Sequence, residues 1–284
     1  MGGRGNNPRL VHLPPLEDTP RISTHSGCNM RTSRIVGMTA VVVLARAAAA
    51  QDPFEIQVYE YATVPAGKFN LETHLNFVHR GTTSFEGNVA PSEHQTHLTF
   101  ELTRGITSWF ELAGYLVTAR REGEAIEYVG WRVRPRVRAP ESWKLPVGLS
   151  LSTEVGFPKD EYEEADATLE VRPVIEWGRG RFLLDVNPVV GRALSGPGSD
   201  EGWDFEPGVR LGWAATKRFD LSLEYYGATG SLSDPLPSNE QVHQFFPGGD
   251  FQITPNIVFN FGVGFGVTDA GNRLVSKTRL GWMF

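Results

Sequence analysis

Four arginines recur at every second position near the middle of the chain and form its most pointed charged pattern. They are Arg132, Arg134, Arg136 and Arg138. Because successive side chains of a strand point to opposite faces, all four would share one face. Such a row could guide anions through a pore. It could also pair with acids on neighbouring strands, and the two uses are compatible. The candidate acids are Glu111, Glu154, Glu170 and Glu176.

Histidines offer a second chemistry, since imidazole is a common metal ligand. His74 and His97 are expected to point into the same interior from adjacent strands. A metal site would need further ligands and a supporting second shell. The sequence has no HExxH motif and no closely spaced His/Cys cluster, so we expect no metal and no cofactor.

Catalysis would be a third chemistry. A phospholipase or deacylase built on a membrane barrel would need a His–x–Ser pair on an outward face, and none occurs. The sequence also has no GxSxG nucleophile turn and no Walker phosphate loop. We therefore expect no enzymatic activity.

The elements that must position these side chains are strands, because apolar and polar residues alternate with a period of two. Twelve strands of 10 to 13 residues are predicted. A tilted strand that crosses a membrane needs about 9 to 11 residues, whereas strands of soluble proteins usually have about 5 to 6. The predicted strands are 68–79, 93–104, 109–120, 126–138, 146–156, 166–177, 181–192, 203–214, 219–228, 242–253, 257–267 and 273–284.

The connections alternate in length. The short ones are 105–108, 139–145, 178–180, 215–218 and 254–256. The mostly longer, polar ones are 80–92, 121–125, 157–165, 193–202, 227–241 and 268–272. Outer-membrane barrels have an even number of strands, short periplasmic turns and longer extracellular loops. The sequence therefore predicts an all-β fold, an antiparallel up-and-down transmembrane β-barrel of about twelve strands over residues 68–284, surrounded by outer-membrane lipid.

Each predicted strand has one apolar and one polar face. In the strand 257–267, Phe259 and Phe261 oppose Asn260 and Gly262. A soluble lipocalin-type barrel would put the apolar face inside, and a membrane barrel would put it against lipid. Twelve long strands carry too many Phe, Trp, Leu and Val side chains for a small barrel's interior. We therefore expect the apolar face outside.

The polar face then lines the lumen. We expect this lining to comprise Glu72, His74, His97, Glu101, Glu111, Arg132, Arg134, Arg136, Glu154, Glu170, Arg172, Asp185, Glu206, Arg210, Glu224, Lys277 and Arg279. Prolines also fall inside the predicted strands, at Pro173, Pro188, Pro207 and Pro247. Because proline removes a ladder hydrogen-bond donor, we expect bulges or strand ends at these positions.

The N-terminal region carries the marks of export. A short cationic stretch at 30–34 precedes an apolar run at 35–45. Three alanines before Gln51 fit a signal-peptide cleavage site. We predict a signal peptide over residues 30–50. Residues 51–67 would then form an N-terminal segment in the periplasm or a partial plug in the lumen.

Residues 1–29 are rich in Pro, Gly and Arg and show no periodicity. We expect them to be a mis-annotated or disordered extension. The only cysteine, Cys28, lies there, so the exported chain would form no disulfide.

Export would leave 21 basic and 31 acidic residues, a net charge of −10. This acidity argues against nucleic acid as a partner.

The last predicted strand alternates strictly and ends in the aromatic pair Trp282 and Phe284. An amphipathic strand that ends in Phe resembles the C-terminal signal of bacterial outer-membrane barrels. We therefore expect the barrel assembly machinery to read Trp282 and Phe284.

Two further stretches carry a resemblance to a family. They are EIQVYEY at 55–61 with PAGKFNLETHLNF at 65–77, and GITSWFELAGY at 105–115. Both resemble outer-membrane proteins grouped with the phenol meta-cleavage pathway (MetA-type) barrels. The resemblance implies an outer-membrane protein linked to the uptake of small, often aromatic, compounds. It implies no particular binding residue.

Three functions fit these observations. The leading hypothesis is a passive channel or facilitator for small solutes, aromatic ones included, which works by diffusion because the chain has no nucleotide site. One alternative is a non-conducting structural barrel whose lumen is closed by ion pairs. The other is a soluble periplasmic β-barrel that binds a ligand in an apolar interior.

Overall fold

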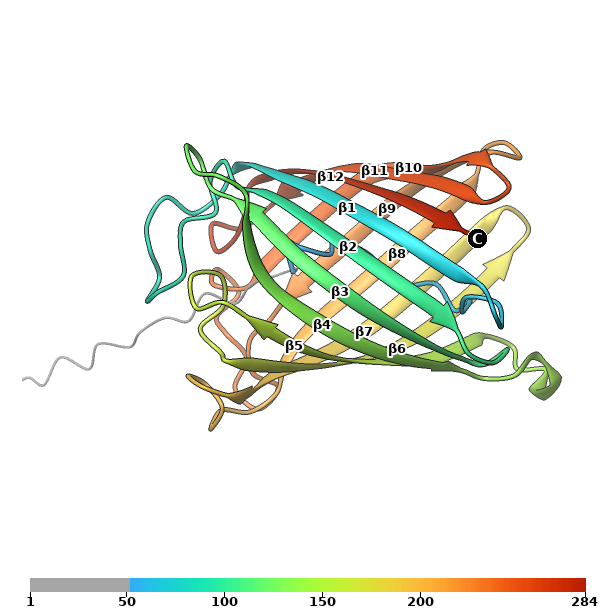
Figure 1. Cartoon of the computed structure of the whole chain (residues 1–284), viewed down its shortest axis with the longest axis horizontal. Coiled ribbons are helices and arrows are strands. Elements are labelled where there is room, and N and C mark those ends of the chain that lie inside the picture. The colour runs from blue at the N-terminus through green and yellow to red at the C-terminus, as the bar shows by residue number, and fades with distance from the viewer. Residues whose placement is uncertain (1–51) are drawn as a thin grey trace, which may run out of the picture. The chain divides into compact units, whose positions relative to one another are not determined.

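The computed structural model describes residues 52–284, which form a closed barrel of twelve antiparallel strands (Figure 1). Each strand pairs with its neighbours in sequence, and β1 pairs with β12 to close the barrel. This confirms the predicted fold class. The expected extension at 1–29 and signal peptide at 30–50 lie outside the described residues. Within residues 52–284, no helix is long and apolar enough to cross a membrane.

The strands begin and end within three residues of the limits predicted from the sequence. Their bounds are β1 (Phe69–Arg80), β2 (Thr96–Gly105), β3 (Phe110–Arg120), β4 (Glu127–Arg138), β5 (Gly148–Pro158), β6 (Ala167–Arg179), β7 (Phe182–Ser195), β8 (Asp204–Ala214), β9 (Phe219–Ala228), β10 (Val242–Thr254), β11 (Ile257–Gly266) and β12 (Leu274–Met283). A short 3-10 turn, η1 (Glu141–Trp143), lies between β4 and β5.

The shortest and the longest connections lie at opposite ends of the barrel (Figure 1), and residues 139–147 between β4 and β5 are the one longer connection at the end of the short turns. The short-turn end holds the connections after β2, β4, β6, β8 and β10, together with the C-terminus. The long-loop end holds the others, including the connection 81–95 between β1 and β2. In outer-membrane barrels the short turns face the periplasm.

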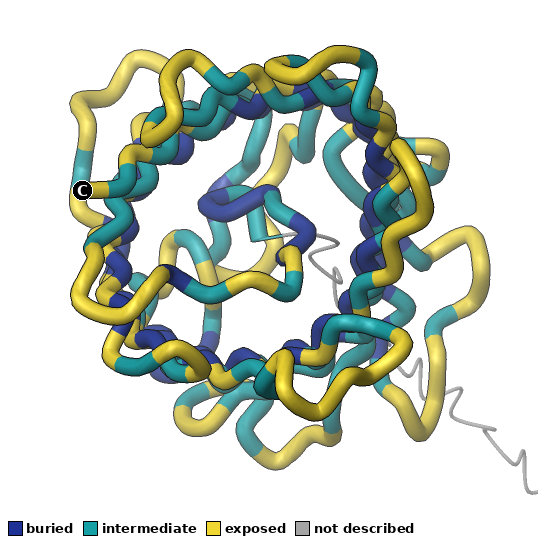
Figure 2. Tube along the Cα trace, turned by 90° about the vertical axis from the view of Figure 1, so that its right-hand side faces the viewer, coloured by how far each residue is buried: buried dark blue, intermediate teal, exposed yellow. Residues whose placement is uncertain are grey.

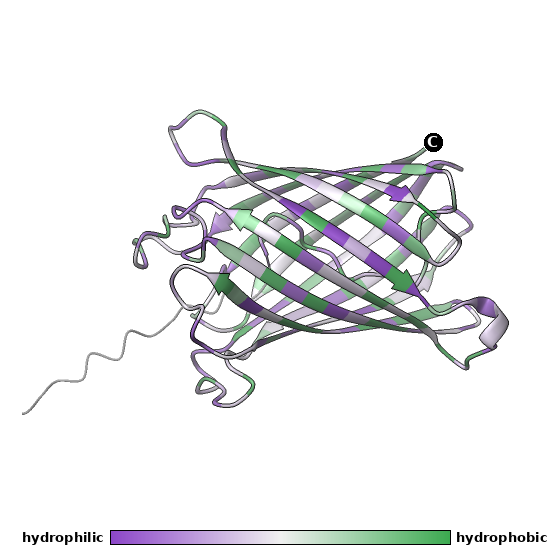
Figure 3. Ribbon diagram, turned by 60° about the horizontal axis from the view of Figure 1, so that its bottom comes forward, coloured by the Kyte–Doolittle hydropathy of each residue, from purple (hydrophilic) through white to green (hydrophobic). Residues whose placement is uncertain are grey.

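The two faces of each strand differ as a membrane barrel requires. Along β3, Leu112 and Leu116 are exposed, while Glu111, Ala113 and Tyr115 are buried. The other strands show the same alternation in hydropathy (Figure 3). Exposed apolar side chains over all twelve strands would be unstable in water and suit contact with lipid. The protein is therefore an outer-membrane β-barrel, and its interior over residues 52–284 is polar rather than the apolar interior that the soluble alternative requires.

The aromatic residues at the end of the chain close the barrel beside β1. Phe284 exchanges two backbone hydrogen bonds of 2.9 Å with Phe69, and the two rings stack with centroids 5.7 Å apart. Trp282 is exposed at the short-turn end, as are Trp109 and Trp213. Tryptophan favours the headgroup level of a membrane because its ring is amphipathic.

The expectation of bulges or strand ends at the prolines is wrong. Pro173 and Pro188 lie opposite each other inside β6 and β7, where the register is interrupted and then resumes unshifted. Pro188 also faces Pro207 across β7 and β8, whose register continues. Pro247 keeps its register with β9 and falls in a gap of the β10–β11 register. A proline nitrogen points toward one neighbour only, so the other ladder continues.

Leu116 tests the lipid-facing assignment. Leu116→Arg is expected to lower the free energy of unfolding by about 2–4 kcal/mol, because the guanidinium would enter the middle of the hydrocarbon layer. Urea unfolding in lipid vesicles measures this change. Phe85→Arg is the matched control, since Phe85 is exposed in a long loop. Equal stability of the two variants would contradict a lipid-facing Leu116.

Candidate functional site

The interior of the barrel is occupied by residues 52–67, which we call the plug. Figure 2, viewed from the short-turn end, shows this segment inside the ring of strands. In its first part, Phe54 packs against Tyr162 of a long loop, with ring centroids 5.7 Å apart. At its other end, Gly67 N donates to Gly105 O at 2.8 Å, beside the start of β1. The plug therefore runs lengthwise through the lumen.

The plug has no strand partner, so side chains of the wall bind its backbone instead. Buried backbone amides and carbonyls need hydrogen-bond partners. Glu111 Oε2 accepts from Val64 N at 2.6 Å, and Glu176 Oε2 accepts from Tyr61 N at 2.8 Å. Wall side chains also donate to plug carbonyls: Asn76 Nδ2 to Pro53 O (2.9 Å), Lys277 Nζ to Ile56 O (3.2 Å), Arg172 Nη1 to Gln57 O (3.1 Å) and Arg136 Nη1 to Glu60 O (3.2 Å).

Tyr59 is the centre of this contact. Its backbone N donates to Asn187 Oδ1 at 2.7 Å, and Asn187 Nδ2 donates to Tyr59 O at 3.0 Å, as a neighbouring strand would. The guanidinium carbons of Arg172, Arg134 and Arg136 lie 4.2, 5.0 and 5.4 Å from the centroid of its ring. Cations over an aromatic face are attracted by its quadrupole, more strongly where water is excluded. Tyr59 therefore joins the plug to β4, β6 and β7.

The arginine row of β4 serves both ion pairing and plug binding. Arg134 Nη1 lies 3.0 Å from Glu111 Oε1, and Arg134 Nε donates to Tyr115 Oη at 2.6 Å. Arg134 also pairs with Glu101, and Arg136 Nε lies 2.8 Å from the same Glu111 oxygen. These groups are buried. Opposite charges that are buried together stabilise each other only when their geometry is close, as here.

The two ends of the row are more open. Arg132 Nη1 lies 3.2 Å from Glu154 Oε1 and also pairs with Asp52 of the plug. Arg138 pairs with the exposed Glu141 at 3.2 Å, near the short-turn end. Each of the four arginines has an ion-pair partner. The row therefore links β4 to neighbouring strands and to the plug.

The structure places all the residues predicted for the lining on the inner faces of their strands. Most are buried, and the half-buried ones are Glu72, Arg132, Glu170, Glu206 and Arg279. A second charge cluster lies across the barrel from the arginine row: Arg210 is 3.3 Å from Asp185 Oδ2 and 2.8 Å from Asp250 Oδ2. Arg279 Nη1 is 2.9 Å from Glu72 Oε1.

The two histidines are not brought together as ligands. His74 faces Thr99 and His97 faces Asn76 in the β1–β2 register, so the two rings are diagonal neighbours. His97 Nε2 bonds Gln95 Oε1 at 2.8 Å, and its ring packs on Phe54 with centroids 4.6 Å apart. His97 therefore supports the plug from the wall.

Several residues of this site were missed by sequence reasoning. Asn187 and Asp250 lie on the polar faces of β7 and β10, where the period of two could have identified them. Glu55 and Tyr59 of the plug gave no such signal, because a segment without regular structure has no period. Tyr115 faces inward on the same face of β3 as Glu111, where the period of two could also have identified it.

A cavity of about 200 Å³ lies between the plug and the wall, mainly on the side of β8 to β12 and β1, with Arg136 of β4 also in its lining. Its charged lining consists of Glu60, Glu72, Arg136, Arg210, Glu224, Asp250, Lys277 and Arg279. Asn70 and Met283 place one part of it near the short-turn end. A second cavity beside Glu206 holds only about 10 Å³, which is too small for a solute.

A contact between two loops at the long-loop end titrates with pH. His94 Nδ1 lies 3.0 Å from Glu122 Oε2, and both side chains are exposed. This hydrogen bond, together with the Glu122 charge, raises the pKa of His94 above its ordinary value. The ion pair between the two loops is therefore present below the raised pKa and is lost as the pH rises through it.

No family model matches the sequence, and no curated protein matches it. Among solved structures, the barrel resembles an outer membrane channel from Pseudomonas putida F1, with a TM-score of 0.54 and 10% identity over 81% of this chain and 100% of that chain. It also resembles the NanC porin, with a TM-score of 0.51 and 9% identity. This similarity covers 75% of this chain and 98% of the porin chain. These similarities establish the fold of outer-membrane barrels. Membership of the MetA-type family stays a prediction.

Arg134 tests the buried charge network. Arg134→Met is expected to lower the free energy of unfolding by about 3–5 kcal/mol, because Glu101 would stay buried without its guanidinium. Arg138→Met is the control and should cost less, about 1 kcal/mol, since its ion-pair partner Glu141 remains in water and the half-buried Arg138 leaves no buried charge behind. Urea unfolding of both variants measures the difference. Similar losses of unfolding free energy in the two variants would show that the buried ion pairs of Arg134 contribute no more to stability than an exposed pair.

Gly105 tests the close approach of the plug to β2. A Cβ at Gly105 would overlap the carbonyl oxygens of Val64 and Pro65. Gly105→Ala should therefore displace the end of the plug, destabilise the protein by about 1–3 kcal/mol, and speed proteolysis within residues 52–67. Gly114→Ala is the control, because a Cβ there meets no atom within 4 Å. An unchanged cleavage rate in Gly105→Ala would contradict this contact.

Proposed function

We propose that this outer-membrane barrel is a passive channel for small polar solutes, which cross the lumen beside the plug. The observation that carries the proposal is the cavity of about 200 Å³ between the plug and β8 to β12. A barrel that served only as a closed structural wall would have no need of a charged space of this volume along its interior.

The lining of this cavity supports a preference for polar solutes. It brings together the cations of Arg136, Arg210, Lys277 and Arg279 and an equal set of carboxylates, and it includes no aromatic side chain. Rings of charged side chains set selectivity in pores. Balanced charges favour zwitterions and small organic acids or bases over apolar compounds.

Aromatic solutes, which the MetA-type resemblance implies, fit this proposal only when they carry polar groups. A bare hydrocarbon ring would have to displace water from paired charges without replacing their hydrogen bonds. A carboxylate or hydroxyl on the ring would restore them. Substituted aromatic acids are therefore the aromatic class that we assign to the channel.

A second candidate is the non-conducting barrel. It is favoured by the number of bonds that hold the plug, above all those of Tyr59 with Asn187 and with the arginines around its ring. In this case the polar lumen would serve to bind the plug, and the cavity would hold water only.

Thr63 distinguishes the two candidates, because it lies on the plug and lines the cavity. The protein is purified from outer membranes as a Cys28→Ser, Thr63→Cys variant and inserted in planar bilayers. We expect steady single-channel conductance that falls by about half or more when a charged thiol reagent modifies the new cysteine, since the lining controls passage.

Phe85→Cys in the same background is the control, because its cysteine would be modified in an exposed loop away from the lumen. Its conductance should not change. If protein shown to be folded by heat-modifiable gel mobility gives no conductance, the non-conducting candidate replaces the channel. If it conducts but modification at residue 63 has no effect, the solute path does not follow this cavity.

A further inference from the structure

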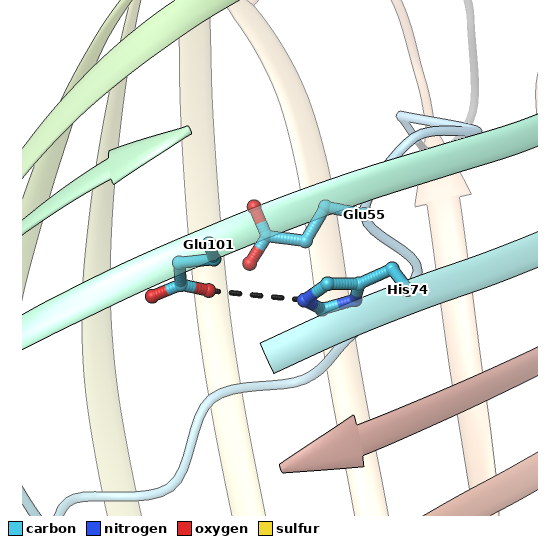
Figure 4. Close-up of side chains that lie close together, drawn as sticks. All are labelled: Glu55, His74 and Glu101. Carbon is cyan, nitrogen blue, oxygen red and sulfur yellow. Dashed lines mark ion pairs between the residues drawn. The ribbon is translucent and has the colours of Figure 1, made fainter. Parts of the chain in front are cut away.

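Three buried side chains converge where the plug meets β1 and β2. Glu55 comes from the plug, His74 from β1 and Glu101 from β2, and one potential ligand atom of each lies within 4.8 Å of the other two. Figure 4 shows the imidazole and the two carboxylates pointing toward one common space. All three residues have relative exposures of 2% or less.

The imidazole of His74 has no hydrogen bond for the nitrogen that faces this space. His74 Nε2 is buried, lies 3.6 Å from Glu72 Oε2 and 3.8 Å from Glu101 Oε2, and makes no hydrogen bond at either distance. A buried polar atom without a partner is costly. The separations of His74 Nε2 from Glu72 and Glu101 are close to those of donor atoms around one metal ion, which are about 3.3–3.6 Å for metal–ligand bonds of about 2.0–2.2 Å in a tetrahedral site. The carboxylate of Glu55 lies within 4.8 Å of the other two ligand atoms and would have to move inward by a small amount to bind the same ion.

The carboxylates around His74 are held by their other oxygens. Glu101 Oε1 accepts from Thr103 Oγ1 at 2.6 Å and also from Arg134. Glu72 Oε1 accepts from Arg279 Nη1 at 2.9 Å. In both residues the second oxygen, Oε2, faces His74 Nε2.

The plug carboxylate is fixed in the same way. Glu55 Oε1 accepts from the hydroxyl of Tyr59 at 2.6 Å. Hydrogen bonds from a second shell that orient ligating carboxylates are a regular feature of metal sites. The arrangement of donors behind Glu55, Glu72 and Glu101 is therefore what a built metal site would have.

We propose that Glu55, His74 and Glu101 bind one divalent transition-metal ion of the Zn²⁺ class, with Glu72 or water as a fourth ligand. One imidazole nitrogen with two or three carboxylate oxygens suits Zn²⁺, whereas Ca²⁺ and Mg²⁺ prefer oxygen ligands alone. The bound ion would give His74 Nε2, which has ion-pair contacts with Glu72 and Glu101 but no hydrogen bond, a direct bonding partner. Because Glu55 belongs to the plug and the other ligands to the wall, the ion would fasten the plug to β1 and β2.

The test is Zn²⁺ binding to the purified, detergent-solubilised protein, measured by titration calorimetry after chelator treatment. We expect one tight site per chain. Glu55→Gln and His74→Gln should each weaken it at least about tenfold. Glu55→Gln keeps the volume of the side chain and leaves the wall unchanged, and heat-modifiable gel mobility shows whether this variant is folded.

His97→Gln is the matched control. His97 is as buried as His74 and also touches the plug, but it lies outside the cluster. Zn²⁺ affinity unchanged in His97→Gln and lost in Glu55→Gln would support the site. Absence of a tight site in the wild type, or an affinity that survives both Glu55→Gln and His74→Gln in protein with folded gel mobility, would overturn it.

The effect of the ion on conductance rests on the proposed function and is measured separately. Zn²⁺ added to planar bilayers should reduce the conductance of the wild type and leave that of Glu55→Gln unchanged, because fastening the plug restricts its movement. A protein that binds Zn²⁺ but conducts nothing would refute the channel and keep the metal site. A conductance that Zn²⁺ does not alter, in protein shown to bind it, would refute the fastening role.

Discussion

An extended segment inside a closed barrel cannot pair with a strand, and the rest of the lumen follows from this constraint. The plug has backbone amides and carbonyls that need partners in a space with little water. The wall supplies them as side chains: carboxylates for the amides of Tyr61 and Val64, cations and amide groups for the carbonyls. A polar lumen is thus needed to hold the plug, apart from any solute.

The same side chains must also neutralise one another. Arg136 donates to plug carbonyls and contacts Glu111, while Glu111 contacts Arg134 and accepts from a plug amide. Each charge therefore has partners both in the wall and in the plug. The stabilising free energy of such a network exceeds the sum of its pairwise interactions, because removal of one member leaves the others buried and unsatisfied. The plug and the barrel stabilise each other through shared groups.

This shared network bears on how such a barrel could conduct. The contacts are dense around Tyr59, whereas the cavity extends toward β8 to β12 and β1, and Arg136 borders both. A solute path there would leave the contacts of Tyr59 with Asn187 and Arg172 in place, and plug residues within 57–64 would border it. The wall thus binds the plug firmly on one side, and it leaves space for water and solute on the other.

Alternation of apolar and polar residues determined the number of strands, their limits within three residues, the outward apolar face and the inward row of arginines, because each is a local property of a period of two. It could not place residues 52–67, which have no period, and so it missed Glu55 and Tyr59. Which charges meet depends on strand register and on closure of β1 with β12, both of which bring together residues far apart in the chain. Only the tertiary structure therefore decided that the arginines of β4 surround a tyrosine and that His74 faces a carboxylate of the plug.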